Sequence, residues 1–166
     1  MSTISRIIGG TALVLLMLDV VCLRGFAADK NIDIPKFKVT GRYANVVNVL
    51  VQKNTSDDEI KSLIIRFREA RASNTLRNLN IPPTTPGGSK GPYGTIQIFV
   101  FSEPEWTDMN RYKRTEKDLA YAKIWNKHVR GYYFWGIYGQ ELGTVGFKED
   151  GVVYTNNYVE IFKKGI

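Results

Sequence analysis

The sequence has very little cysteine and histidine. It contains one Cys and one His in 166 residues. A single cysteine cannot form an intramolecular disulfide, and a single histidine cannot build the multi-histidine sites of zinc enzymes. We therefore expect no metal ion and no other cofactor, and a fold that depends on its hydrophobic core.

The chain has little low-complexity sequence outside a Pro/Gly-rich loop, and its fraction of charged residues is not unusual. Charged residues make up 23% of the chain and hydrophobic residues 43%. These proportions are ordinary for a folded protein and exclude disorder, collagen and a coiled coil. Because a chain of this length split in two would leave two small cores, a single domain is favoured.

The N-terminus has the pattern of a secretory signal peptide. Arg6 precedes an apolar run over residues 7–18, and Gly25 and Ala27 place small residues three and one positions before a cut after Ala27. Residues 1–27 are therefore predicted to be a leader. We expect a periplasmic or extracellular protein, most simply bacterial because the chain lacks paired cysteines.

An uncleaved membrane anchor is the alternative interpretation of this leader. The apolar run is shorter than the ~20 residues of a spanning helix, and Asp19 near its end is costly inside a bilayer. We expect cleavage and no stable membrane span afterwards. Cys22 lies within the leader, so the mature chain would have no thiol.

A β-α-β pattern follows an irregular tail predicted over residues 28–42, which can end in a short edge strand. Residues 43–53 and 95–101 are apolar on both faces, as in central strands. Between them, Ser56 and Glu59 form a capping-box pattern before a helix that ends near residues 71–74. A Pro/Gly-rich loop covers 75–94. The buried stripe of this helix is predicted to be Ile60, Leu63, Ile64 and Phe67.

The C-terminal half predicts a second helix and a meander. We expect a turn over 102–110, then a helix over 115–129 capped by Thr115 with Asp118 at its third position. Strands are predicted at 132–138, 143–148 and 158–162, with Asp150-Gly151 as a hairpin turn. The predicted fold is α/β or α+β: residues 43–166 form one domain, with a single mixed sheet and helices packed on it.

Two carboxylates are the candidates for catalysis. Glu103 and Glu105 follow a predicted central strand, beside Trp106, and open α/β sheets place their sites at such strand ends. A Glu in an aromatic pocket can act as a general acid if a second carboxylate is near. Solvated turn residues are the more ordinary interpretation. The lone His128 lacks a nucleophile-elbow motif with Ser89 or Ser102, so catalysis through it is not expected.

Basic and aromatic residues offer a binding surface. The net charge is +7, and residues 111–114 read Arg-Tyr-Lys-Arg, a mixture that suits phosphates with base or sugar stacking. In the strand at 132–138, Tyr133 and Trp135 lie on one face; either they form a solvent-facing platform or helices cover both faces of the sheet. The candidate binding residues are Trp106, Arg111, Tyr112, Lys113, Arg114, Tyr133 and Trp135.

Two local motifs have simpler interpretations. The run Gly87–Gly91 lacks the spacing of a phosphate-binding loop and is read as a turn. Asn54-Thr55-Ser56 matches a glycosylation pattern but coincides with the helix cap.

We hypothesise an exported, small, basic binding domain without catalytic activity. Its partner would be a protein, a glycan or an anionic polymer of the cell envelope. The alternatives are a hydrolase that attacks a polysaccharide through Glu103 or Glu105, and a general polyanion-binding protein.

Overall fold

The computed structural model describes residues 34–166, so the predicted leader and its cysteine lie outside the described residues. Within this part, strand and helix follow each other as the sequence predicts for an α+β fold. The elements are β1 (Phe37–Tyr43), β2 (Val46–Val51), α1 (Asp57–Ala72), the 3₁₀ helix η1 (Leu76–Leu79), β3 (Ile96–Phe101), the 3₁₀ helix η2 (Pro104–Thr107), α2 (Met109–Thr115), α3 (Leu119–Asn126), β4 (Gly131–Trp135), β5 (Glu141–Val145), β6 (Lys148–Glu149), β7 (Val152–Val153) and β8 (Val159–Lys164).

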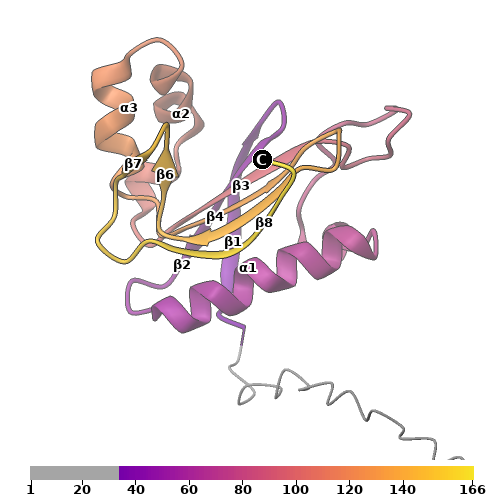
Figure 1. The fold of residues 1–166 in the computed structure, drawn as a ribbon, viewed down its shortest axis with the longest axis horizontal. Helices are drawn as coiled ribbons and strands as arrows, with labels where there is room; N and C mark the ends of the chain where they lie inside the picture. Colours follow the sequence, from indigo (N-terminus) through magenta and orange to yellow (C-terminus); the bar gives the residue numbers. More distant parts are fainter. Residues whose placement is uncertain (1–33) are drawn as a thin grey trace, which may run out of the picture. The chain divides into compact units, whose positions relative to one another are not determined.

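One mixed sheet of six strands is the centre of the described fold. Its order is β1-β2-β3-β4-β5-β8, with β2 and β3 parallel and the other neighbours antiparallel. Because α1 connects the two parallel strands, the predicted β-α-β unit is confirmed. The antiparallel meander through β3, β4, β5 and β8 is confirmed as well. Figure 1 shows α1 on one side of the sheet, with α2, α3 and the β6–β7 hairpin on the other.

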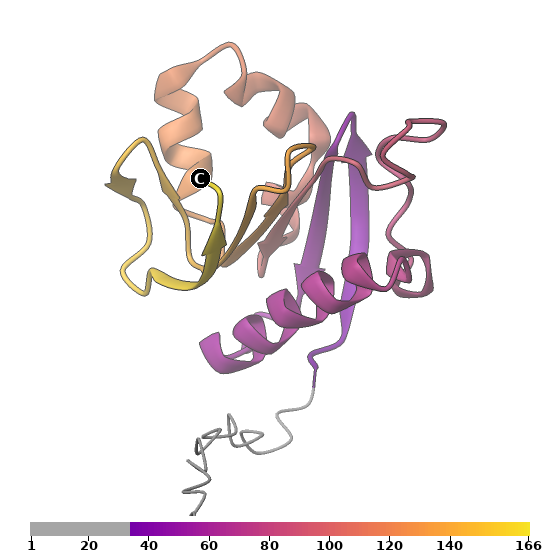
Figure 2. The same ribbon diagram turned by 45° about the vertical axis from the view of Figure 1, so that its right-hand side comes forward.

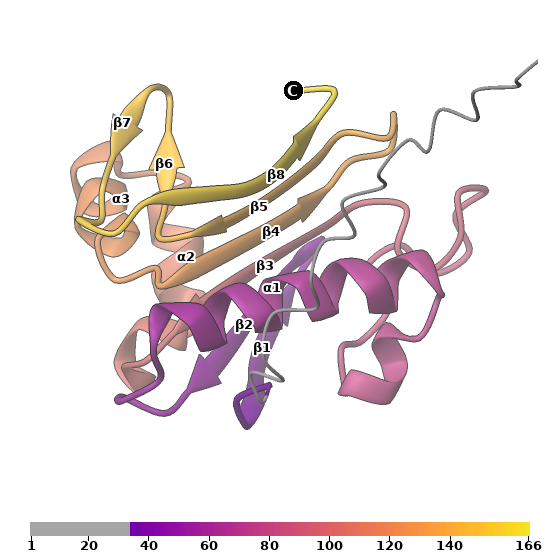
Figure 3. The ribbon, with the colours of Figure 1, turned by 60° about the horizontal axis from the view of Figure 1, so that its bottom comes forward.

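Helix α1 forms as its sequence pattern predicts. The Ser56 hydroxyl accepts a hydrogen bond from the Glu59 amide, and the Glu59 carboxylate accepts one from the Ser56 amide at 2.7 Å. This capping box pairs two donors that the first helical turn would leave free. The predicted apolar stripe is fully buried against the sheet, and α1 runs obliquely across the strands (Figure 3). The partners of this stripe on the sheet are Val47, Val49, Val51, Ile96, Ile98, Val100, Tyr133 and Val145.

A second apolar cluster covers the opposite face. Phe99 and Phe101 point to this side, and the Trp125 ring packs against both with centroid separations of 4.9 and 5.0 Å. Val46, Val129 and Phe147 complete the buried part of the cluster. The sheet therefore has a core on each face, which explains why the central strands are apolar on both sides.

The predicted single helix over 115–129 is wrong. The chain forms two short helices instead, and the second is capped by Asp118, whose side chain accepts from the Tyr121 amide at 2.9 Å. Thr115 ends α2 rather than capping a helix, because its hydroxyl donates to the Tyr112 carbonyl. Of the apolar residues in this segment, Leu119 and Ile124 are exposed, while Trp125 and Val129 are buried.

The segments that join these elements mostly follow their predicted turn chemistry. Strand β1 takes up residues 37–43, so the edge strand is longer than expected and includes the end of the segment predicted to be irregular. Asp150 and Gly151 both have positive φ in the β6–β7 turn, as in a type I′ hairpin. The loop after α1 contains η1 and is anchored by the Tyr93 hydroxyl, which donates to the Ile81 carbonyl at 2.7 Å. Figure 2 shows it beside the β1–β2 hairpin.

Candidate functional site

The segment after β3 is built by local hydrogen bonds and one buried anchor. Pro104 begins η2, where its fixed φ suits the first turn, and the Thr107 hydroxyl donates to its carbonyl at 2.7 Å. The Asn48 side chain, buried on β2, donates to the Thr107 carbonyl at 3.0 Å. Asp108 then caps α2 by accepting from the Asn110 amide. Residues 102–114 are thereby held in one geometry next to the sheet.

Trp106 brings together residues that lie far apart in the sequence. Its ring stacks on the His128 imidazole, with centroids 3.8 Å apart and an interplanar angle of 11°. The Arg111 guanidinium lies 4.7 Å from the centroid of the same Trp106 ring. On the main chain, the Trp106 carbonyl accepts from the Trp125 indole N–H at 3.1 Å. Trp106 is thus held rigidly, although its ring remains partly exposed.

Each basic side chain of α2 lies over an aromatic ring. Besides Arg111 over Trp106, Lys113 Nζ lies 4.8 Å from the centroid of Tyr43, and Arg114 lies 4.1 Å from that of Tyr121. We call this set the α2 surface; it comprises Tyr43, Trp106, Arg111, Lys113, Arg114 and Tyr121. Cation–π contacts of this kind fix flexible basic side chains without neutralising them.

The charges of the α2 surface are only partly compensated. Arg114 forms an exposed ion pair with Asp118 at 3.1 Å. Arg111 and Lys113 form no ion pair with any carboxylate of residues 34–166, although Arg111 donates to the Tyr121 hydroxyl at 3.3 Å. Two of the three cations therefore keep their capacity to pair with an external anion.

Tyr112, the one aromatic residue of the segment 111–114, lies on the core side of α2. Its ring centroid lies 6.1 Å from that of Phe99 and 5.7 Å from that of Trp125. Burial raises the pKa of its hydroxyl. The α-helical period turns this residue inward and its basic neighbours outward, so Tyr112 packs the helix against the sheet rather than facing a ligand.

Of the two interpretations of the strand at 132–138, a solvent-facing platform is wrong for Tyr133. This side chain is fully buried beneath α1, where its hydroxyl donates to the Glu141 carboxylate at 3.2 Å. Trp135 is half-buried, and the Arg71 guanidinium lies 3.0 Å from its ring centroid. The second of the two interpretations holds, since helices cover both faces of the sheet.

Glu103 and Glu105 have different surroundings. The Glu103 carboxylate lies 2.8 Å from His128 Nδ1, and both side chains are partly exposed. Glu105 is exposed. Residues 34–166 contain no group of three or more Cys, His, Asp or Glu side chains placed to hold a metal ion. Sequence reasoning missed the Glu103–His128 pair, because His128 follows α3 and only the folding of α3 onto the sheet brings the two together.

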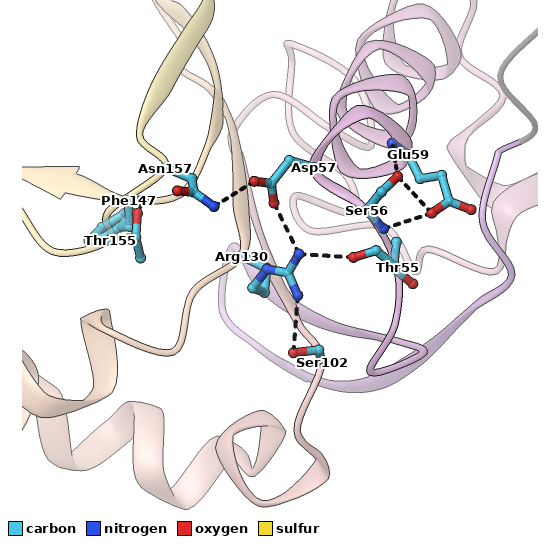
Figure 4. Close-up of polar contacts among 9 residues, drawn as sticks. All are labelled: Thr55, Ser56, Asp57, Glu59, Ser102, Arg130, Phe147, Thr155 and Asn157. Atoms are coloured by element: carbon cyan, nitrogen blue, oxygen red, sulfur yellow. Dashed lines mark hydrogen bonds and ion pairs between the residues drawn. The ribbon is translucent and has the colours of Figure 1, made fainter.

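A pocket of about 260 Å³, lined by both polar and apolar residues, lies at the N-terminus of α1. Arg130 is its central residue: it donates to the Thr55 carbonyl at 2.9 Å and to Asp57 at 3.0 Å. Asn157, from the loop before β8, donates to the other Asp57 oxygen at 2.8 Å. Figure 4 shows these side chains pointing toward one another. The Arg130 guanidinium is thus paired with protein groups. Arg130 acts as a structural clamp that joins the N-terminus of α1, the start of β4 and, through Asp57, the β7–β8 loop.

This chain shows no match to a protein-family model, to a curated protein or to a solved structure. Among residues 34–166, no helix has the length and apolar character needed to cross a membrane.

Proposed function

We propose that this protein is an exported binding domain without catalytic activity, which holds an anionic polymer on the α2 surface. The observation that carries the proposal is the pairing of every α2 cation with an aromatic ring. Cations that are already positioned lose little conformational entropy when an anion binds. His128 and Arg111 lie over the Trp106 ring, and its partly exposed edge adds apolar contact for a sugar or a base.

An acidic polysaccharide of the cell envelope is the partner favoured by the predicted export. Its carboxylates or sulfates would pair with Arg111 and Lys113, and its rings would contact the exposed edge of Trp106. Single-stranded nucleic acid presents similar chemistry. The same binding assay separates the two when it is run with heparin and with an oligothymidine of matched charge.

The test removes the cations and keeps the helix. The triple variant Arg111→Ala, Lys113→Ala and Arg114→Ala should weaken heparin binding by about tenfold or more. Affinity falls as the salt concentration rises, and the magnitude of the slope of log affinity against log salt should decrease by about one for each cation that pairs with the polymer. A matched control is Lys163→Ala with Lys164→Ala, which removes exposed cations from β8. Equal binding by the triple variant and the wild type would refute the proposal.

A hydrolase is the second candidate, and the Glu103–His128 pair favours it. A carboxylate hydrogen-bonded to Nδ1 orients an imidazole so that Nε2 can accept a proton from water. In that case Glu103→Gln and His128→Asn would each abolish the release of reducing ends from a polysaccharide, while Glu105→Gln would not. Absence of turnover by the wild-type protein on a panel of envelope glycans would leave the binding domain as the function.

Export has its own test. We propose that the leader is removed after Ala27, so the intact mass of the protein from its bacterial host should correspond to residues 28–166. A mass that includes residues 1–27 would instead indicate an anchor.

A further inference from the structure

Strand β1 leaves one edge of the sheet open beside a groove. It pairs only with β2 among the described strands. A groove of about 880 Å³ runs along β1 and is closed on its far side by residues of η1 and the following loop, namely Asn78, Leu79, Asn80 and Pro82. Figure 2 shows the β1–β2 hairpin and the η1 segment beside each other. The free N–H and C=O groups of an edge strand are a template for another strand.

The groove is strongly cationic. Lys36, Lys38 and Arg42 line it, and all three are exposed. None of the described residues that line it is Asp or Glu, and none of these three cations forms an ion pair within residues 34–166. The occupant that complements this potential is an anion.

The remaining surface of the groove suits a polypeptide. Phe37, Val39 and Leu79 contribute half-buried apolar side chains, so cations and apolar groups alternate along β1. An open backbone edge next to such alternation matches an extended peptide, whose main chain supplies the hydrogen bonds and whose alternate side chains meet the pockets. We propose that this groove binds an extended acidic segment of a partner protein, which adds to the sheet as a strand next to β1.

A second copy of this chain is a poor occupant. Pairing of two β1 strands would bring like charges together, and lysines on edge strands discourage such self-association. A glycan or a nucleic acid would leave the backbone edge unpaired, because neither carries a regular row of amide donors and acceptors. The groove and the α2 surface are therefore assigned to different ligands, and each assignment can fail without the other.

The probe is a fluorescent peptide of alternating Glu and Val, with the seven-residue length of β1. We expect saturable binding to the full mature chain, with NMR amide shifts concentrated in residues 36–42 and 78–82. Only alternate residues of an added strand donate to their neighbour. N-methylation of one alternate set of peptide amides should therefore abolish binding, whereas methylation of the other set should leave it unchanged.

Charge-reversal variants complete the test. Lys36→Glu with Lys38→Glu should weaken peptide binding by about tenfold, while Lys163→Glu with Lys164→Glu on the opposite edge strand should not. The α2 triple variant should bind the peptide like the wild type, which separates this result from the proposed function. The proposal would be overturned if methylation of the two peptide sets had equal effects, or if a Lys/Val peptide bound as tightly as the Glu/Val peptide. It would also be overturned if self-association of the protein caused the NMR shifts in β1.

Discussion

At the scale of single residues, Tyr133 and Glu141 form a buried polar contact that makes stability depend on pH. The Tyr133 hydroxyl and the Arg68 guanidinium both donate to the Glu141 carboxylate, at 3.2 and 3.1 Å. Burial raises the pKa of Tyr133 far above its ordinary value, and the negative charge of Glu141 raises it further. The folded protein therefore keeps a proton that the unfolded chain loses near its ordinary pKa of about 10.

This raised pKa predicts alkaline destabilisation. The stabilising contribution of Tyr133 is fully present below about pH 10 and is lost as the pH rises above it, because the unfolded state then binds fewer protons than the folded state. Tyr133→Phe should cost about 1 kcal/mol at neutral pH because the hydrogen bond to Glu141 is removed, yet it should flatten the alkaline fall measured by urea unfolding. Burial also raises the pKa of Tyr132. The part of the alkaline loss of stability that comes from Tyr132 should therefore remain in the Tyr133→Phe variant.

Tyr138→Phe is the control for this experiment, since Tyr138 is 88% exposed. Its variant should retain the full alkaline loss of stability. An unchanged alkaline slope in Tyr133→Phe would show that its hydroxyl ionises equally in both states.

Arg130 supports a second prediction at this scale. Its guanidinium joins the Thr55 carbonyl to Asp57 and lies 3.5 Å from the Ser102 hydroxyl. Arg130→Met keeps the apolar stem but leaves these partners unpaired, and should lower the free energy of unfolding by about 2 kcal/mol. Arg114→Met, which removes an exposed ion pair, should change it by less than about 1 kcal/mol. Equal changes in the free energy of unfolding for the two variants would contradict the role of Arg130 as a structural clamp.

Sequence reasoning at the residue scale succeeded where partners are close along the chain. The Ser56–Glu59 capping box is confirmed because its two members are three residues apart and its geometry is that of any helix N-terminus. Arg130 and Asp57 are far apart in sequence, and so are His128 and Glu103. No local pattern marks such pairs, because only the packing of whole elements brings their side chains together.

At the scale of elements, α1 approaches the sheet closely at Gly131. A Cβ added there would lie 2.6 Å from Ile60 Cγ2 and 3.4 Å from Ile64 Cδ1. Gly131→Ala should therefore force α1 away from β4 and destabilise the protein by about 1–3 kcal/mol.

A double-mutant cycle identifies the contact. Leu lacks the Cγ2 branch of Ile, so Ile60→Leu should relieve the collision, and the cost of Gly131→Ala should be smaller in the Ile60→Leu background. Free energies from urea unfolding of the four proteins measure this coupling. Additive costs would mean that the alanine is accommodated elsewhere.

The predicted helix over 115–129 shows why element boundaries were hard to assign. Asp118 follows Thr115 at the capping-box spacing and also stands where a later helix can begin, so one pattern supported two different starts. The structure uses Asp118 as the cap. By contrast, α1 was predictable from the single helical period of its apolar residues, and β2 and β3 from short runs that are apolar on both faces. Most of these side chains are buried.

At the scale of the whole molecule, a single sheet carries a core on each face. Strands β2 and β3 contribute to both cores and have neighbours on both edges. The two-sided apolar pattern of these strands predicted this arrangement. The same pattern in β4 was ambiguous between a platform and a core, because an aromatic strand has the same sequence pattern whether its second face is covered or open. The structure covers the Tyr133 face of β4 with α1, and Tyr132 on the other face packs in the cluster that contains Phe99 and Trp125.

This arrangement predicts an order of local stability. Amides of β2 and β3 should exchange most slowly with deuterium, at rates that report the global free energy of unfolding, because opening them disrupts both cores. Amides of β8, an edge strand with exposed Val159, and of the two-residue strands β6 and β7 should exchange much faster. Hydrogen exchange measured by NMR over a series of low urea concentrations distinguishes these classes.

The helices on the second face decide whether the two cores unfold together. α2 and α3 bury few side chains, Trp125 chief among them, so they should open below the global free energy while β3 remains protected. Trp125→Phe should then accelerate exchange in α2 and α3 more than in α1. If α1 and α3 accelerated equally, the cores on the two faces would be one cooperative unit, and the α2 surface would be as rigid as the sheet that supports it.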